Sequence, residues 1–135
     1  MKKVEVVAAV IRRDRFILCC QREQNKLIYL SEKWEFPGGK IEEGESKEHA
    51  LMREIQEELE MEIFDLRFVL TVVHNYEDFE LTMHVYFATT RQIEFKLNSH
   101  MAARWVGFEE LEQFDWAEAD RPIVSYILGN STQLQ

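Results

Sequence analysis

The sequence contains little cysteine, proline or glycine. Its 135 residues include two cysteines, two prolines and five glycines. Cys19 and Cys20 are adjacent in an apolar run, so on a strand they point to opposite faces and cannot link distant segments. We therefore interpret both as reduced core residues rather than as part of a disulfide framework. No repeat, linker or low-complexity segment stands out either.

Basic residues are also in the minority. The chain has 16 Lys and Arg against 25 Asp and Glu, which gives a formal net charge of -9. Binding to duplex nucleic acid needs clustered basic residues that displace counterions, so we expect no polymeric nucleic acid partner. A small anionic ligand remains compatible with this charge, because a divalent cation can bridge protein carboxylates to phosphate.

Long apolar runs are missing as well. No stretch approaches the ~20 apolar residues of a membrane span, and the N-terminus lacks the features of a signal peptide. These absences predict a cytoplasmic protein with no membrane partner. Apolar residues nevertheless make up 46% of the sequence, which is enough for one hydrophobic core. We expect a single domain over residues 1–129 and a frayed tail at 130–135.

The residue pattern predicts a mixed β-sheet sandwiched between helices, an α/β or α+β layered domain. Apolar and β-branched runs predict two hairpins, and Trp34 to Phe36 form a further short strand that ends at a turn of Pro37, Gly38 and Gly39. The expected hairpins span 4–12 with 15–22 and 64–75 with 79–89, a last strand spans 102–107, and helical segments span 46–59, 109–113 and 117–128.

Acidic side chains are concentrated on the first of these helices. Eight glutamates fall within the nineteen positions 42–60. The chain-wide acidic content would give about 3.5 there. Glu54, Glu57 and Glu58 stand at i, i+3 and i+4, so their carboxylates share one helix face. They repel one another, whereas a hard cation such as Mg²⁺ or Mn²⁺ would bind them. Taken alone, the same spacing also fits a solvated acidic face.

The order of the neighbouring residues favours the first interpretation. Gly39 is followed after five residues by Glu45, and after seven more by Arg53 and the run Glu54 to Met61. This order resembles the signature of the Nudix hydrolases, in which Gly, Glu, Arg-Glu and Glu-Glu occur at the same spacing. Every position fits except the final Gly of the signature, where this chain has Glu60.

The resemblance extends beyond this segment. The Met-Lys-Lys start, the stretch Trp34 to Lys40 and the stretch Ala119 to Pro122 are similar to the MutT-type nucleotide pyrophosphohydrolases. The resemblance implies a Nudix fold and hydrolysis of a nucleoside triphosphate to the monophosphate and pyrophosphate. It also implies a role in sanitising the nucleotide pool and so in DNA repair, with oxidised guanine nucleotides such as 8-oxo-dGTP as the expected substrate.

The resemblance also implies a metal site. Arg53 matches the residue that orients the glutamates, and Glu45 matches a supporting residue. Mg²⁺ is the expected cofactor, with Mn²⁺ possible. Hydrolysis at phosphorus needs charge neutralisation and an activated water, so we expect Glu54 or Glu57 to be the general base. The residues that match metal ligands are Glu54, Glu57, Glu58 and, through its carbonyl, Gly38.

Two positions depart from the family pattern. Glu60 replaces a Gly that ends the helix in a left-handed conformation, which is unfavourable for Glu by about 1 kcal/mol. Either the helix ends differently here or the strain is accepted. Ser99 stands six residues before Trp105, where many relatives have a glutamate that binds metal or acts as a base. His100 and Glu94 are the candidate substitutes.

Four further residues are candidates for substrate binding. Arg22 matches a phosphate-facing arginine, although a surface arginine at a strand end fits equally well. Asp120 matches a residue that contacts the base edge, and the alternative is an N-cap ahead of Pro122. If protonated, Asp120 could bind a guanine-like edge; if ionised, it could accept from an exocyclic amine. Phe36 and Phe79 could flank the base, although either could be a core residue.

Three alternatives for the function and assembly remain open. A pyrimidine nucleotide such as CTP or dCTP is the alternative substrate. A catalytically silent nucleotide-binding module is the alternative from another class, because Glu60 and Ser99 depart from the signature. The expected partner is the nucleotide alone, and the chain is expected to be a monomer or a homodimer.

Overall fold

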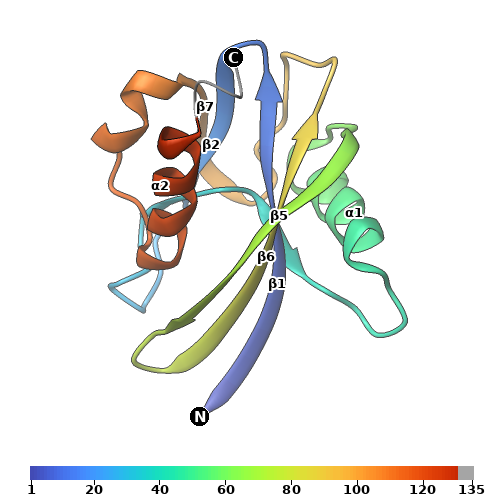
Figure 1. Ribbon diagram of the computed structural model, residues 1–135. Helices are drawn as coiled ribbons and strands as arrows, with labels where there is room; N and C mark the ends of the chain where they lie inside the picture. The colour runs from blue at the N-terminus through green and yellow to red at the C-terminus, as the bar shows by residue number, and fades with distance from the viewer. Residues whose placement is uncertain (131–135) are drawn as a thin grey trace.

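The computed structural model describes residues 1–130 as a seven-stranded mixed sheet with helices on both sides (Figure 1). This confirms the predicted fold class. The strands are β1 (Lys2–Arg13), β2 (Phe16–Arg22), β3 (Trp34–Glu35), β4 (Gly38–Lys40), β5 (Phe64–Asn75), β6 (Phe79–Thr89) and β7 (His100–Gly107). The α-helices are α1 (Lys47–Leu59) and α2 (Arg121–Gly129), and the 3₁₀ helices are η1 (Phe108–Gln113) and η2 (Glu118–Asp120).

The first two strands diverge after their turn. β1 and β2 pair only at two positions beside that turn. Beyond it, β1 pairs with the short strand β4, while β2 pairs with β3 and β7. The link from β3 to β4 crosses the gap, and the Ala9 N–H donates to the Pro37 carbonyl at 2.8 Å. On its other edge β1 runs parallel to β6, which pairs with β5. The gap between the diverging strands is where the functional site opens.

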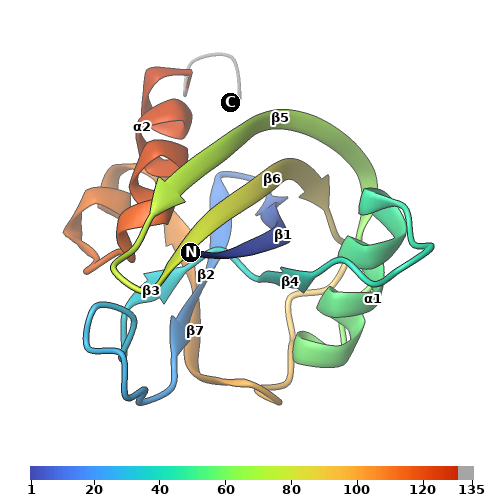
Figure 2. The same cartoon turned by 90° about the horizontal axis from the view of Figure 1, so that it is seen from below.

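Alternating residues of β1 face two different cores, as a strand requires. Val7, Ala9 and Ile11 pack against α1, whereas Ala8 and Val10 pack toward α2 and the 3₁₀ helices. Figure 2 shows α1 and α2 on opposite sides of the strands. The middle of β1 is therefore covered on both faces.

Helix α1 begins as predicted. The Ser46 side chain accepts a hydrogen bond from the His49 N–H at 3.1 Å, which satisfies one of the free donors of the first turn. The apolar side chains of the helix form one buried stripe, which leaves the glutamates on the opposite side. The stripe consists of Ala50, Leu51, Ile55 and Leu59.

Helix α1 ends in a left-handed conformation, although this conformation is unfavourable for Glu60. Glu60 adopts the left-handed conformation at φ 53° and ψ 45°, and its N–H donates to the Gln56 carbonyl. A following segment then binds the free carbonyls of the last turn. The Asn98 side chain donates to the Glu57 carbonyl at 2.9 Å and to a Glu60 carboxylate oxygen at 3.1 Å. The segment around Asn98 therefore helps to hold α1 in a conformation that Glu60 does not favour on its own.

Two predictions of local structure need correction. The expected turn at Pro37, Gly38 and Gly39 is wrong for the glycines, because both lie in β4, where β1 offers hydrogen-bonding partners. The helical segment expected at 109–113 is confirmed and is the 3₁₀ helix η1. The last helix begins at Arg121, after η2, and not at Ala117, so Pro122 lies in its first turn, where a missing N–H is tolerated.

Of the expected tail at 130–135, residues 131–135 lie outside the described residues. Among residues 1–130, no helix has the length and apolar character needed to cross a membrane.

Candidate active site

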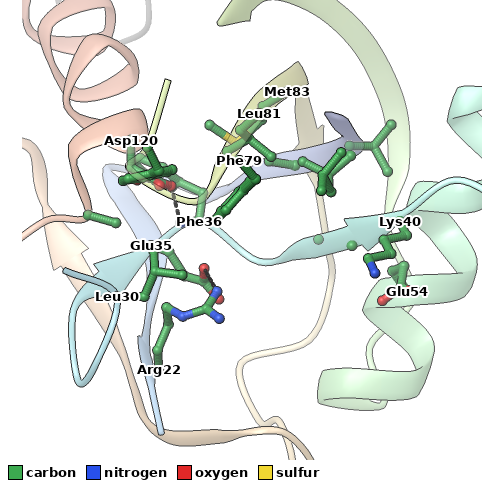
Figure 3. A pocket seen from close by; sticks show the side chains of 18 of the residues that line it. Arg22, Leu30, Glu35, Phe36, Lys40, Glu54, Phe79, Leu81, Met83 and Asp120 are labelled. Atoms are coloured by element: carbon green, nitrogen blue, oxygen red, sulfur yellow. Dashed lines mark hydrogen bonds and ion pairs between the residues drawn. The ribbon is translucent and has the colours of Figure 1, made fainter. Parts of the chain in front are cut away.

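A cavity of about 530 Å³ lies where β1 and β2 diverge (Figure 3). Glu54 and Glu58 of α1 and Lys40 of β4 line one end, and Asp120 lines the other. The wall between them is largely apolar and aromatic. It includes Leu27, Leu30, Phe36, Tyr76, Phe79 and Met83. One cavity therefore has a charged end and an apolar end.

The glycines of β4 allow this close packing at the charged end. A Cβ atom on Gly38 would lie 1.9 Å from the Val7 carbonyl oxygen, so no side chain fits there. A Cβ atom on Gly39 would lie 2.2 Å from Oε2 of Glu54. The carboxylate of Glu54 thus rests directly against the β4 backbone. These contacts give a physical reason for both glycines that does not depend on a turn.

Arg53 connects the glutamates of this end. Its Nε donates to Oε2 of Glu45 at 2.6 Å, and its Nη1 donates at 2.9 Å to one oxygen of Glu54 and of Glu57. Its Nη2 also donates to the Lys40 carbonyl at 3.1 Å, which joins α1 to β4. The hydrogen bond from Arg53 lowers the pKa of Glu45 to about 2. Arg53 therefore bridges three carboxylates, and its predicted orienting role fits this geometry.

Glu58 has no such cation. Burial raises the pKa of its carboxyl group to about 7, and Oε1 is buried without a hydrogen-bond partner among the described residues. An unpaired buried carboxylate oxygen is costly. A divalent cation would satisfy it, and oxygen donors are what Mg²⁺ prefers. The chemistry of Glu58, with Glu54 beside it on α1, therefore fits a bound metal ion.

The predicted ligand set is not fully assembled. Within residues 1–130, no three carboxylate, imidazole or thiol groups converge closely enough to form a metal site as they stand. The reason lies in Arg53, which engages Glu57 and one oxygen of Glu54. The Glu57 side chain is 59% exposed and free to turn. The metal-binding role of Gly38, Glu54, Glu57 and Glu58 stays a prediction.

A second, polar cavity of about 240 Å³ adjoins the charged end. Arg22, Glu35 and Glu58 line both cavities, and Ser99 and His100 line the second. Among residues 1–130, three buried side-chain nitrogen or oxygen atoms have no partner, and all three belong to this cavity. They are Arg22 Nε, Glu58 Oε1 and His100 Nδ1.

Glu35 joins Arg22 and His100 in this region. Its Oε1 accepts from Arg22 Nη1 at 2.9 Å, and its Oε2 lies 2.9 Å from His100 Nε2. Burial lowers the pKa of His100, but the hydrogen bond and charge of Glu35 outweigh it, so the pKa is raised overall. Of the two substitutes considered for the missing late glutamate, His100 lies at the site, whereas Glu94 is exposed and lines neither cavity.

Asp120 closes the apolar end. Its Oδ2 accepts a hydrogen bond from the Phe36 N–H at 2.9 Å (Figure 3). Although Asp120 precedes α2, its side chain makes no capping hydrogen bond, so the N-cap alternative is wrong for the side chain. Burial raises the pKa of this carboxyl group well above its ordinary value, and Glu35 adds to the effect. The neutral acid is therefore favoured, and it can donate a hydrogen bond as well as accept one.

The two predicted aromatic residues differ in their exposure. Phe36 is 3% exposed and stacks on Trp116 with ring centroids 4.7 Å apart, so it is also a core residue. Phe79 is half-buried and packs on Tyr76 at the cavity wall. Sequence reasoning missed Tyr76 and Glu35. Glu35 stands within the Trp34 to Lys40 stretch, but nothing in that stretch indicated that its carboxylate would bind Arg22 and His100.

Comparison with known proteins now identifies the family. The family model described as NUDIX domain matches residues 6–126. Because the match covers most of the chain and both ends of the cavity, the chain belongs to the Nudix family. It is a MutT-type hydrolase, a nucleotide pyrophosphohydrolase.

The named relatives include a CTP pyrophosphohydrolase and several 8-oxo-dGTP diphosphatases. The chain is 35% identical over 130 residues to the CTP pyrophosphohydrolase of Escherichia coli (strain K12), covering 96% of this chain and 94% of the relative. It is 37% identical over 120 residues to the putative 8-oxo-dGTP diphosphatase 2 of Mycobacterium tuberculosis (strain ATCC 25618 / H37Rv), covering 86% and 82%. The whole-chain likeness therefore does not separate the two substrates.

Solved structures agree on the fold. The solution structure of the E. coli ORF135 protein matches with a TM-score of 0.80 at 32% identity, covering 98% of this chain and 94% of that one. The crystal structure of the MutT NUDIX hydrolase from Burkholderia pseudomallei matches with a TM-score of 0.81 at 26% identity, covering 93% and 98%.

Proposed function

We propose that this enzyme hydrolyses a nucleoside triphosphate to the monophosphate and pyrophosphate with the help of Mg²⁺ or Mn²⁺. The observation that carries the proposal is a single cavity with glutamates at one end and an aromatic, apolar compartment at the other. The phosphates would lie at the glutamate end, beside Arg22, and the base would lie between Phe79 and Asp120. We place the reaction in the cytoplasm, where a nucleotide-pool enzyme meets its substrates.

At the charged end, Glu54, Glu58 and the Gly38 carbonyl would hold the cation, joined by Glu57 once it turns from Arg53. The bound ion would neutralise charge on the phosphate oxygens. Arg53 engages Oε1 of Glu54, so Oε2, which lies against Gly39, would take the proton in an arrangement where Glu57, Glu58 and the Gly38 carbonyl hold the cation. Burial raises the pKa of Glu54 against the opposing effect of Arg53, which makes it a stronger base. We therefore favour Glu54 over Glu57 as the acceptor of the proton from the attacking water.

At the apolar end, a neutral Asp120 supports an oxidised guanine nucleotide as the substrate. Its Oδ2 already accepts from the Phe36 N–H, so the proton of the neutral acid belongs on Oδ1. That O–H can donate to a base edge that presents an acceptor, as the carbonyl oxygen of a guanine does. The aromatic wall provides flat surfaces for a purine ring. 8-oxo-dGTP is the leading substrate on these grounds.

A pyrimidine nucleotide is the second candidate. The observation that favours it is the 35% identity to the E. coli CTP pyrophosphohydrolase, which extends over 96% of the chain. Cytosine presents an exocyclic amine, which would need an acceptor at Asp120. An ionised Asp120 would offer a free accepting oxygen for that contact, whereas the accepting oxygen of the neutral acid already binds the Phe36 N–H, so the raised pKa of Asp120 weighs against the pyrimidine.

A kinetic panel tests the proposal. Rates of pyrophosphate release would be measured with 8-oxo-dGTP, dGTP, CTP and dCTP at millimolar Mg²⁺. The expected result is the highest kcat/KM with 8-oxo-dGTP and no release without a divalent cation. Glu57→Gln is expected to slow the reaction because it removes a predicted ligand. Tight nucleotide binding without turnover would instead establish the silent binding module, and a preference for CTP would establish the pyrimidine alternative.

A further inference from the structure

His100 stands at the edge of the site but contacts neither the glutamates of α1 nor Asp120 by a hydrogen bond. It is the first residue of β7 and pairs with Arg22, the last residue of β2, where the register shifts between Gln21 and Arg22. Such irregularities turn a side chain away from the regular direction of the strand. The His100 side chain is 3% exposed, so it occupies a fixed position.

A chain of two hydrogen bonds leads from His100 to Arg22. A carboxylate only accepts, so His100 Nε2 carries a proton and donates it to Oε2 of Glu35 at 2.9 Å. The other oxygen, Oε1, accepts from Arg22 Nη1 at 2.9 Å. Each oxygen of Glu35 therefore has one partner on a different strand. Figure 3 shows the Arg22 guanidinium beside the Glu35 carboxylate.

This arrangement leaves Arg22 with free donors in a fixed place. Its guanidinium is planar, so a bond to Nη1 limits the direction of the remaining N–H groups. Nε is buried and has no partner among residues 1–130. Arg22 also lines both cavities, between the apolar compartment and Glu58. A phosphate oxygen is the acceptor that a guanidinium at this position fits best.

We propose that His100 is a positioning residue, which acts through Glu35 to hold the Arg22 guanidinium where it binds a phosphate group of the nucleotide. The inference rests on the proposed function, because it requires a phosphate-bearing substrate. His100 fixes one oxygen of Glu35, and this leaves the other oxygen for Arg22. Without His100, the Glu35 carboxylate can rotate and Arg22 loses its orientation. A preorganised donor binds its ligand more tightly than one that must first be ordered.

The alternative is a buried histidine whose only role is packing. The two roles differ in what a substitution changes. Loss of packing lowers stability, whereas loss of positioning weakens phosphate binding only while Arg22 is present. The His100–Glu35 contact therefore has to be tested together with Arg22, and on nucleotide affinity rather than on stability.

The test is a double-mutant cycle with His100→Leu and Arg22→Ala. KM, kcat and the Kd of a nonhydrolysable nucleoside triphosphate would be measured for each variant. His100→Leu is expected to raise KM and Kd about tenfold, comparable to the loss of one well-placed charge-assisted hydrogen bond, with kcat nearly unchanged. In the Arg22→Ala background, the same change is expected to have no further effect. His100→Gln retains an N–H donor and is expected to restore most of the affinity.

Two further variants complete the design. His84→Leu is the matched control, because His84 also contacts a glutamate, Glu5 at 2.6 Å, but lines neither cavity; its KM and Kd should not change. If His100→Leu unfolds, Glu35→Gln carries the test, since an amide binds Arg22 less well than a carboxylate does. Additive effects of His100→Leu and Arg22→Ala, or an unchanged Kd in Glu35→Gln, would overturn the inference. A wild-type protein that binds no nucleoside triphosphate would instead refute the proposed function.

Discussion

The surroundings of the acid groups differ between the two ends of the cavity. At the glutamate end, Glu45 is held ionised by Arg53, which lowers its pKa to about 2. At the apolar end, Asp120 has no basic side chain within hydrogen-bonding distance, and burial raises its pKa well above the ordinary value. A carboxyl group that is paired with a cation can serve as a fixed anion. One that is left unpaired in an apolar site becomes neutral and can donate a hydrogen bond.

Glu58 lies between these two cases. It is largely buried at the glutamate end, yet Arg53 does not reach it, and burial raises its pKa to about 7. The comparison suggests why it is left unpaired. A cation that arrives with the substrate could bind the unpaired Oε1 of Glu58. An arginine paired permanently with Glu58 would prevent that cation from binding. We therefore propose three separate roles: fixed charge around Arg53, recognition of the base by a neutral Asp120, and binding of an exchangeable cation at Glu58.

The largest expected effect comes from the glutamate end. Glu54→Gln is expected to lower kcat by about 10²- to 10⁴-fold, because the amide can neither accept a proton nor neutralise a cation. Steady-state pyrophosphate release measures this. Glu48→Gln is the matched control, since Glu48 is exposed on the first turn of the same helix. Equal rates for Glu54→Gln and the wild type would show that Glu54 is not the base.

Substitutions at the apolar end should change the base preference rather than the chemistry. Asp120→Asn retains an acceptor for the Phe36 N–H and presents N–H donors to the base, as neutral Asp120 does with its O–H. It should therefore keep activity on 8-oxo-dGTP, while Asp120→Leu should lose about 10²-fold in kcat/KM. Competition between 8-oxo-dGTP and CTP measures the ratio of kcat/KM for the two nucleotides. If Asp120→Asn loses activity as completely as Asp120→Leu does, Asp120 acts as an anion and the comparison fails.

The pH dependence of metal binding tests the state of Glu58. A cation requires the ionised carboxylate, and the folded protein holds the pKa near 7, above the ordinary 4.5. Affinity for Mn²⁺ should thus rise about tenfold per pH unit below pH 7 and level off above it. Titration of free Mn²⁺ by electron paramagnetic resonance at pH 6, 7 and 8 measures this. Glu58→Gln should remove the dependence, and a flat wild-type profile would refute the assignment.

Substitutions at the two glycines of β4 should differ in their effects on stability and on kcat. Gly38→Ala places a Cβ atom 1.9 Å from a backbone oxygen, so it should lower the free energy of unfolding by about 1–3 kcal/mol or more. Gly39→Ala instead meets the Glu54 carboxylate, which can move, so it should lower kcat with a smaller loss of stability. Denaturant unfolding and steady-state kinetics on both variants decide the matter. The reverse ranking would contradict the packing described for Glu54.

The smallest expected effect lies outside both ends of the cavity. Glu60→Gly relieves the left-handed conformation at φ 53° and should stabilise the protein by up to about 1 kcal/mol, less the contribution of the Glu60 contact to Asn98. Thermal unfolding measures the gain, and kcat should not change. A loss of stability would mean that the Asn98 contact outweighs the strain.

The two ends also differ in how far the sequence predicts them. The residues of the glutamate end lie in one stretch, from Gly38 to Glu58, so spacing alone predicts the shared helix of Arg53 and the glutamates, although it did not predict that Gly38 and Gly39 lie in β4. Arg53 is close to its carboxylate partners because they stand at neighbouring positions of that stretch. Local spacing was therefore sufficient to predict that Arg53 and these glutamates lie together.

The apolar end could not be predicted in the same way. Phe36 and Asp120 are joined by a hydrogen bond across 84 positions, and Tyr76 reaches the Ala119 N–H across 43. Such contacts depend on how β1 and β2 diverge, which no local pattern encodes. Only the resemblance to a family suggested Asp120. No feature of the sequence indicated the hydrogen bond from His100 to Glu35, which are 65 positions apart.

The most direct test of the whole account is the identity of the products. The reaction of 8-oxo-dGTP with Mg²⁺ in ¹⁸O-labelled water would be followed by ³¹P nuclear magnetic resonance. If the triphosphate binds with its base at Asp120 and its phosphates at the glutamate end, the products are the monophosphate and pyrophosphate, with a single ¹⁸O in one of them. Release of orthophosphate and the nucleoside diphosphate, or no reaction on any nucleoside triphosphate, would contradict it.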